Sequence, residues 1–330
     1  MPHACTLCSN SEGNLVHEAR EMMFGTRDKF RYLECGRCGT IQLLEIPDLA
    51  KYYPKNFYAF DSKIGIGKTA LHRLAAKSVG KYFLHGRGTA GKFLASKEPR
   101  FGAWFHQSIR EPLLGLDFSS RILDFGCGSG RMLQALHYFG FRDLTGADAF
   151  IENDIVHESG VTIHKKGLDE LAPGFDLVML HHVFEHLPNP RETLQQIHRL
   201  LDYEKFCLIR MPVAAFAWEK YGPDWVQLDP PRHLFIFTEK YFRSMAESSG
   251  FRVEKVVYDS DEFQFWGSEQ YLRDIPLCDE RSYNGTADGS VFTAEQISEW
   301  RRQATLLNEK GNGDQACFYL RKLSGTAKPA

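Results

Sequence analysis

Long apolar stretches, a leader segment and an excess of charge are all missing from this chain of 330 residues. Nowhere do about 18 consecutive apolar residues occur, as a membrane-spanning helix requires, and the first residues lack the basic and apolar regions of a secretion signal. Forty basic and 42 acidic side chains leave a formal net charge of -2, so bulk charge does not draw the protein to nucleic acid or membranes. We therefore expect a cytoplasmic protein without a transmembrane segment.

The chain divides into three segments that differ in character. Residues 1–50 hold two cysteine pairs, and residues 51–105 are first aromatic and then basic, as in a helical connector. Residues 106–330 alternate strand-like and helix-like runs, which predicts an α/β domain. Within it, residues 259–315 are too many for a plain loop and are expected to form a partly helical lid or substrate-binding insertion before the last strand.

A glycine-rich turn, Asp124–Gly130, follows the first predicted strand of this domain and precedes a predicted helix. Such a unit cradles a small ligand, because glycines let the backbone approach closely and the helix N-terminus offers free amides. Asp148 lies 24 residues after Asp124, at the end of the second strand, where an acid would bind ribose hydroxyls. Both a dinucleotide and S-adenosylmethionine fit these features.

The acid at the start of the turn distinguishes between the two candidate ligands. A dinucleotide would place its pyrophosphate here, where the carboxylate of Asp124 would repel it. S-adenosylmethionine has no phosphate but carries an ammonium and a sulfonium, which a carboxylate attracts. The turn therefore favours S-adenosylmethionine, although Asp124 can also be explained as a brace for the turn.

Four motifs resemble the successive motifs of class I S-adenosylmethionine-dependent methyltransferases, namely Asp124–Gly130, Gly146–Asp148, Phe175–Val178 and His182–Pro190. The resemblance covers about residues 105–260 and the last strand. It implies a Rossmann-like sheet of seven strands, the last one antiparallel. It also implies a cofactor site in which the glycines line the methionine part, Asp148 holds the ribose, and a nearby loop borders the adenine. The residues of this site are Asp124, Gly126, Gly128, Gly130, Asp148, Gly167, Leu168 and His181.

The reacting end should lie just after the fourth strand, because ligands of open α/β sheets bind at the carboxyl ends of the strands. His182, Glu185 and His186 stand there. Histidine is suited to take a proton from an acceptor hydroxyl. We interpret His182 or His186 as the base, oriented by Glu185, with His233 of a later loop as a rival; each histidine can also be explained as a structural, hydrogen-bonded residue.

A catalytic metal is not expected at this place. The segment also resembles that of ubiquinone O-methyltransferases, which hold a magnesium-type ion with two acids and a histidine. Here His182 takes the position of the first acid.

The two cysteine pairs, Cys5 with Cys8 and Cys35 with Cys38, have the spacing C-x2-C-x26-C-x2-C. Four thiolates on two tight turns match tetrahedral zinc, and a site without an open position is structural. The pattern predicts a small zinc ribbon, with free or redox-active cysteines as the alternative.

A four-cysteine module followed by aromatic residues, then a methyltransferase domain, resembles sugar methyltransferases of the deoxysugar C-methyltransferase type and of bacterial polysaccharide gene clusters. The segments that carry this resemblance are Lys51–Pro54, Asn56–Tyr58, Asp229–Phe237 and Phe265–Tyr271. C-methyltransferases carry a further C-terminal domain, so the resemblance favours O-methylation of a sugar hydroxyl in a nucleotide-sugar, glycolipid or polysaccharide precursor. An RNA, quinone or small aromatic acceptor remains open, as does a non-catalytic adaptor.

Between residues 63 and 100, nine lysines and arginines accompany a single acid, Glu98. This is the composition of a solvated helical face. It would also suit the phosphates of a nucleotide- or lipid-linked glycan, or a peripheral contact with an anionic membrane. Nucleic acid ranks lower as a partner, because the net charge is near zero and no stacking array accompanies the basic residues.

Overall fold

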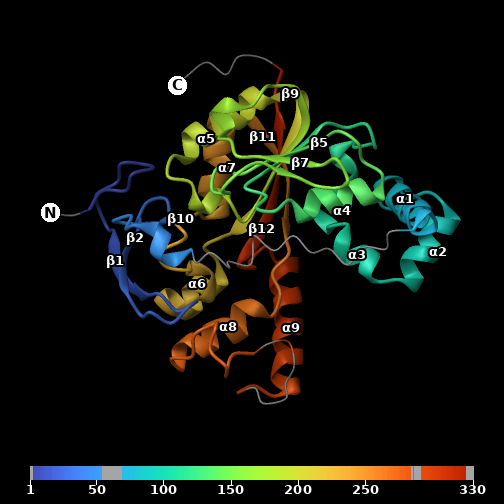
Figure 1. The fold of residues 1–330 in the computed structure, drawn as a ribbon. Helices are drawn as coiled ribbons and strands as arrows, with labels where there is room; N and C mark the ends of the chain where they lie inside the picture. The colour runs from blue at the N-terminus through green and yellow to red at the C-terminus, as the bar shows by residue number, and fades with distance from the viewer. Residues whose placement is uncertain (1–2, 54–68, 284, 286–290, 325–330) are drawn as a thin grey trace.

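The computed structural model describes residues 3–53, 69–283, 285 and 291–324. A mixed β-sheet stands at the centre with helices on both faces (Figure 1). A small second sheet lies on one side, and two helices project below. Asn56–Tyr58, Lys63 and Lys68, which figure in the sequence-based predictions, lie outside the described residues. Within the described ranges, no helix has the length and apolar character needed to cross a membrane.

The central sheet has eight strands in the order β11-β12-β9-β8-β4-β5-β7-β6. Its middle strands are parallel and comprise β4 (Ile122–Phe125), β5 (Leu144–Ala147), β7 (Thr162–His164), β8 (Phe175–His181) and β9 (Leu201–Pro212). The last strand, β12 (Gln315–Lys322), runs antiparallel between β9 and β11 (Phe251–Tyr258). The predicted α/β sheet with an antiparallel last strand is confirmed.

The predicted number of seven strands is wrong. An additional strand, β6 (Ile155–Val156), pairs antiparallel with β7 at the edge of the sheet. Two residues are too few to show the alternation of apolar and polar side chains by which a strand is recognised in a sequence. The extra strand does not change the order of the other seven.

The core lies on both faces of this sheet, as β8 shows. Leu177 and Met179 belong to one buried cluster, whereas Val178 and Leu180 belong to another. Successive side chains of a strand point to opposite faces. An apolar run in the middle of the sheet therefore fills two cores at once.

Helices cover the two cores. Those on the face of Val178 include α5 (Pro190–Leu200), α6 (Phe216–Tyr221) and α7 (Glu239–Ser248). Those on the face of Leu177 include α1 (Ala70–His85), α3 (Arg100–Trp104) and α4 (Arg131–Phe139), with α2 (Thr89–Lys97) packed against α1. In this way the helices of the basic segment rest on the domain through α4 (Figure 1).

The N-terminal residues form a second, antiparallel sheet in the order β1-β2-β3-β10, with β1 (Leu15–Arg20), β2 (Lys29–Glu34) and β3 (Ile41–Leu43). Its fourth strand is β10 (Phe235–Ile236), which follows β9 in the chain and pairs with β3. Tyr32 and Ile41 of this sheet belong to the same buried cluster as Phe237. The N-terminal sheet thus shares a core with the α/β domain.

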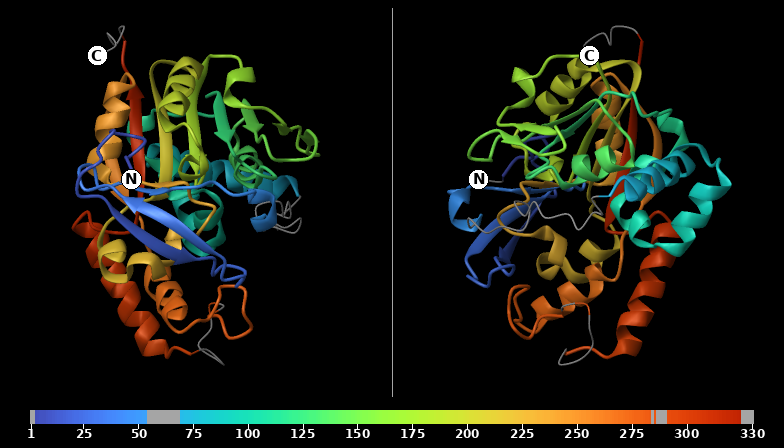
Figure 2. Two further views of the ribbon diagram at one scale, coloured as in Figure 1. Left: turned by 90° about the vertical axis from the view of Figure 1, so that its left-hand side faces the viewer. Right: turned by 45° about the vertical axis from the view of Figure 1, so that its right-hand side comes forward.

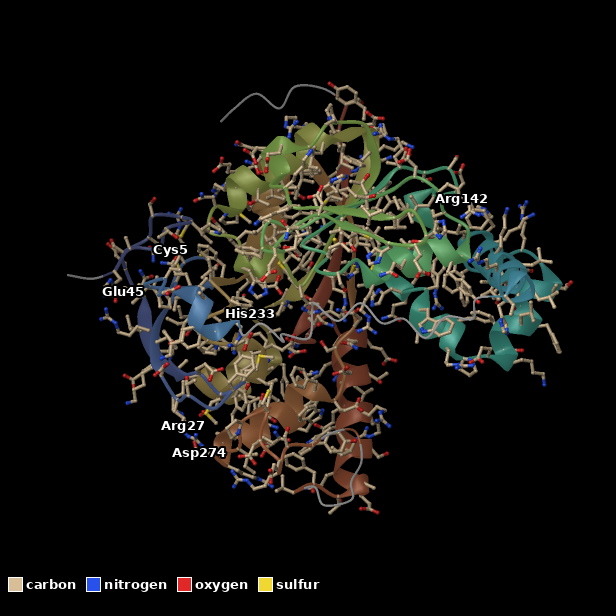
Figure 3. All side chains as sticks on the ribbon, viewed as in Figure 1. Cys5, Arg27, Glu45, Arg142, His233 and Asp274 are labelled. Atoms are coloured by element: carbon tan, nitrogen blue, oxygen red, sulfur yellow. The ribbon has the colours of Figure 1, made fainter. Side chains whose placement is uncertain are left out.

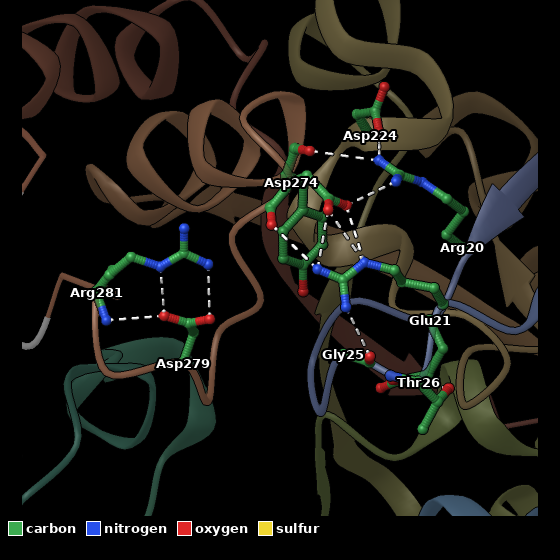
Figure 4. Close-up of polar contacts among 10 residues, drawn as sticks. Arg20, Glu21, Gly25, Thr26, Asp224, Asp274, Asp279 and Arg281 are labelled. Atoms are coloured by element: carbon green, nitrogen blue, oxygen red, sulfur yellow. Dashed lines mark hydrogen bonds and ion pairs between the residues drawn. The ribbon is translucent and has the colours of Figure 1, made fainter.

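The insertion before β12 contains two helices, α8 (Phe263–Leu272) and α9 (Ala294–Glu309). Both helices lie within residues 259–315, where the sequence predicts a partly helical insertion. The β1–β2 hairpin lies against this insertion (Figure 2). Arg20 bonds both Asp224 and Asp274, as Figure 4 shows, and Arg27 pairs with the same Asp274.

Candidate functional site

The glycine turn between β4 and α4 has a backbone conformation that favours glycine. Gly126, Gly128 and Gly130 have φ values of 71°, 53° and 75°, which side chains rarely adopt. A Cβ on Gly126 would also lie 2.5 Å from Val183, and one on Gly130 would lie 2.3 Å from Ile163. The turn therefore packs directly on residues of the neighbouring strands and loops, and the amides of all three glycines donate hydrogen bonds within the protein.

Two acids stand beside this turn. Asp148 accepts hydrogen bonds from the amide of Gly128 (2.9 Å) and the amide of Phe150 (2.8 Å). Asp124 is 4% exposed, and its burial, together with the charge of Asp148, raises its pKa to about 8. A pair of buried carboxylates that repel each other provides a favourable place for a cation.

The residues expected near the adenine, Gly167 and Leu168, lie between β7 and β8. Gly167 donates its amide to Glu170 at the start of a short 3-10 turn. Leu168 is buried in one cluster with Phe125 and Ala147, the last residues of β4 and β5. Leu168 therefore contributes packing beneath the strand ends.

Strand β8 ends in His181, which is half-buried. Its ring meets the ring of His106 edge to face, with centroids 5.2 Å apart. Among the described residues, its Nε2 has no hydrogen-bond partner. Burial holds the pKa of His181 well below its usual value, so the ring is neutral.

His182 is held in an uncommon conformation, with φ at 53°. Its Nε2 faces Nη1 of Arg210 and must accept that hydrogen bond, since a guanidinium only donates. The remaining nitrogen, Nδ1, then carries the hydrogen and lies 3.5 Å from Oε1 of Glu185. Arg210 is itself held by Asp259 at 2.7 Å. Both nitrogens of His182 are thus engaged.

Glu185, His186 and His233 come together although they lie up to 48 positions apart in the chain. The carboxylate of Glu185 is fully buried, and neither oxygen has a hydrogen-bond partner among the described residues. Nε2 of His233 lies 3.8 Å from Oε1 of Glu185, and the rings of His186 and His233 stand edge to face with centroids 4.7 Å apart. Sequence reasoning proposed His186 and His233 as rivals; the structure places them side by side.

Main-chain carbonyls fix the tautomers of both rings. Nδ1 of His186 donates to the carbonyl of Arg232, and Nδ1 of His233 donates to the carbonyl of Gln227, each at 2.8 Å. The lone pair of each ring is therefore on Nε2. Burial lowers the pKa of His233 to about 4, so this ring is neutral at physiological pH.

The loop that carries His233 is held by the N-terminal sheet, which the sequence analysis did not foresee. Arg232 is 1% exposed and bonds Asp229 within the loop and Glu21 after β1. Tyr32 of β2 donates to the carbonyl of His233 at 2.9 Å. These contacts join residues about 200 positions apart, so no local signal could have found them.

The four N-terminal cysteines form a second cluster. Their sulfur atoms all lie within 4.8 Å of one another, with 3.8 Å between Cys5 and Cys38 and 3.5 Å between Cys8 and Cys35. Four sulfurs at about 2.3 Å from one tetrahedral ion would lie about 3.8 Å apart. The cluster therefore fits a zinc ion. Figure 3 labels Cys5 at the N-terminal sheet and His233 nearer the centre of the molecule.

Comparison with known proteins gives one family match. The family described as methyltransferase domain matches residues 89–256, which is more than half of the chain. None of the curated proteins compared with the sequence matches it.

Three solved structures are among those that resemble parts of this chain. A SAM-dependent methyltransferase from Archaeoglobus fulgidus is 18% identical, with a TM-score of 0.39, over 70% of this chain and 94% of its own. An S-adenosylmethionine-dependent methyltransferase from Mesorhizobium loti is 17% identical, with a TM-score of 0.39, over 65% and 98%. A cyclopropane synthase from Mycobacterium tuberculosis is 14% identical, with a TM-score of 0.40, over 64% and 81%.

Proposed function

The chain belongs to the methyltransferase domain family and is an S-adenosylmethionine-dependent methyltransferase, and from this premise we propose that it methylates a sugar hydroxyl. The acceptor would be a nucleotide-sugar, a glycolipid or a polysaccharide precursor. The observation that carries the proposal is the buried cluster of Glu185, His186 and His233 beyond the end of β8. A hydroxyl must lose its proton when it is methylated, and this cluster offers the groups that promote that loss. The choice of a sugar rests on the sequence resemblance described above.

In this proposal the cofactor lies along the glycine turn. Its ammonium and sulfonium face Asp124, and its ribose hydroxyls face Asp148. Gly167 and Leu168 border the adenine, and His181 borders the methyl-bearing end. The close packing of Gly126 against Val183 links this turn to the segment that carries Glu185.

The reaction itself is a single displacement. The acceptor oxygen attacks the methyl carbon in line, the sulfur–carbon bond breaks, and S-adenosylhomocysteine leaves as a neutral thioether. The hydroxyl proton is lost at the cluster of Glu185, His186 and His233. His182 has no free nitrogen, because Arg210 and Glu185 occupy both sides of its ring. We therefore assign His182 to positioning Glu185 rather than to taking the proton.

We further propose that Cys5, Cys8, Cys35 and Cys38 hold one structural zinc ion. Support comes from the sulfur separations, which fit a tetrahedral ion, and from the absence of any disulfide among these four cysteines. Four protein ligands leave no open position, so the ion would stabilise the N-terminal sheet and take no part in the reaction.

The exposed basic side chains of α1 and α2 would contact the phosphates of a nucleotide- or lipid-linked acceptor. Arg73, Lys77, Lys81 and Lys92 are all exposed there. Contacts of this kind weaken as salt screens them. A rise of KM for the acceptor with ionic strength, without a change of cofactor affinity, would support this assignment.

Transfer of a labelled methyl group from S-adenosylmethionine tests the function directly. Pools of nucleotide-sugars, glycolipids, RNA and quinones would each be offered as acceptor. Label should enter only the nucleotide-sugar or the glycolipid pool. His186→Gln and His233→Gln should lower turnover by about 10²-fold while cofactor affinity stays intact. Label in RNA or quinones alone would refute the sugar, and failure to bind the cofactor in calorimetry would indicate an adaptor.

A further inference from the structure

The cluster of Glu185, His186 and His233 has an arrangement that proton transfer alone does not require. A buried carboxylate is costly unless it is paired or hydrogen-bonded. Yet the side chain of Glu185 is fully buried, and neither oxygen makes a well-formed hydrogen bond among the described residues; the nearest donor of His182, Nδ1, lies 3.5 Å from Oε1. Such a carboxylate calls for a positive charge in direct contact.

The two histidines present the matching ligands. Each donates Nδ1–H to a main-chain carbonyl at 2.8 Å, which leaves the lone pair of Nε2 free. Histidines that bind metals are commonly fixed in this way, because the second hydrogen bond sets the tautomer and the ring orientation. One ligand atom from each of the three residues lies within 4.8 Å of the others.

The separations suit one small ion. Nitrogen and oxygen ligands about 2.1 Å from a tetrahedral ion lie about 3.4 Å apart, and Nε2 of His233 is already 3.8 Å from Oε1 of Glu185. A small movement of the side chains of Glu185, His186 and His233 would bring all three ligand atoms to such separations.

Neighbouring charged groups are already paired. Arg232 donates to both oxygens of Asp229, whose Oδ2 lies 4.0 Å from Nε2 of His233, and Nε2 of His182 is taken by Arg210. No arginine or lysine is paired with Glu185 within the described part of the chain.

We propose that Glu185, His186 and His233 bind a divalent first-row transition-metal ion that holds the acceptor hydroxyl. Two imidazoles and one carboxylate favour zinc, manganese, iron or cobalt over magnesium, which prefers oxygen ligands. Three protein ligands leave a position for the acceptor oxygen. There the ion lowers the pKa of the hydroxyl, whose proton then passes to solvent water as the oxygen takes the methyl group.

This site differs from the magnesium-type site of two acids and one histidine. The sequence did not lead us to expect that site. His182, which stands where an acid would be needed for a magnesium-type ion, is turned to Arg210 and takes no part. The third ligand is instead His233, brought from the loop that the N-terminal sheet supports. The catalytic role of the ion rests on the proposed function, whereas the binding of the ion can be tested without it.

Cobalt titration of the full chain, monitored by absorption, tests the binding. After removal of metal, the wild type should bind two equivalents of Co²⁺. One should show the intense near-ultraviolet bands of thiolate ligands, from the cysteine cluster, and the other only weak visible bands of nitrogen and oxygen ligands. Cys35→Ser should remove the first set and retain the second with lower affinity, because the N-terminal module supports the loop of His233.

Variants of the cluster of Glu185, His186 and His233 should have the opposite effect on the two cobalt equivalents. Glu185→Gln and His233→Gln should each abolish the second equivalent and retain the first, and His186→Gln serves as a half-buried alternative if a buried variant fails to fold. His198→Gln is the matched control, since it alters a half-buried histidine that packs on Phe251 outside the ligand set, and it should keep both equivalents. Calorimetry with S-adenosylmethionine verifies that each variant retains the fold. An excess of Mg²⁺ should not displace the cobalt.

Each outcome has a distinct meaning. A wild type that binds only the thiolate equivalent, with cofactor affinity intact, overturns the metal site; the cluster would then take the proton directly and the proposed function would stand. Loss of the second equivalent in the His198→Gln control also overturns this ligand set. Two equivalents with no methylated acceptor would refute the proposed function and leave the metal site in place.

Discussion

Tyr32, in the N-terminal sheet, donates a hydrogen bond of 2.9 Å to the main-chain carbonyl of His233 in the loop after β9. Tyr32 is fully buried, and beside it Glu21 bonds the buried Arg232. β10, which directly follows this loop, is the fourth strand of the same N-terminal sheet. The cysteine-bearing module thus forms one wall of the site around His233 and is more than an appendage.

Tyr32→Phe removes this hydrogen bond with little change of shape. The carbonyl of His233 would lose its donor, so the free energy of unfolding should fall by about 1 to 3 kcal/mol. Turnover should fall about tenfold, because small displacements of reacting groups are costly, while cofactor affinity should be unchanged. Denaturant unfolding and methyl-transfer kinetics measure these effects. Tyr203→Phe, at an exposed position, is the control, and equal loss in both variants would argue against the link.

Cys35→Ser should disrupt the N-terminal module. Cys35 is buried in the cysteine cluster, and losing one thiolate ligand should release zinc to a chelating dye and lower the melting temperature. Turnover should fall as well, since the module supports the loop of His233. Cys278→Ser replaces an exposed cysteine outside the cluster and should change neither property. Full activity of the metal-free Cys35→Ser protein would show that the module and the site are independent.

Local sequence patterns predicted the α/β sheet well, because each buried strand and each amphipathic helix carries its own periodic signal. The turn of Gly126 and the spacing of Cys5 and Cys8 are local too. The features that were missed depend on long-range contacts or on very short elements. β6 has two residues, and β10 is recognisable only through its pairing with β3.

The roles of the histidines show the same limit of prediction from local sequence. Sequence alone placed His182 among the candidate bases, since it follows β8 directly. Its role depends on Arg210, whose guanidinium occupies Nε2, and on the strained backbone at φ 53° that turns the ring. Neither the partner nor the conformation leaves a trace in the neighbouring residues. A site made by contacts between distant segments needs the fold before its members can be assigned.

Gly126→Ala should weaken cofactor binding without unfolding the protein. The new methyl group would lie 2.5 Å from Val183, at a residue whose φ of 71° already disfavours a side chain. The glycine turn would shift, and we expect at least about a tenfold loss of affinity, or about 1.4 kcal/mol. Gly160→Ala is the matched control, because its φ is 86° but no atom lies within 4 Å of the new group. Calorimetry that finds equal affinity in both variants would contradict this expectation.

Asp124 should make cofactor affinity depend on pH. In the free protein, burial and the charge of Asp148 raise its pKa to about 8, so at pH 7 the carboxyl is mostly protonated. A cationic ligand favours the ionised form, so binding must release a proton. Affinity should therefore rise with pH below about 8, by up to about tenfold per unit, and level off above it. Calorimetry in buffers of different ionisation enthalpy measures the released proton. Asp124→Asn should bind more weakly and lose the dependence; a dependence that persists in this variant would place the titrating group elsewhere.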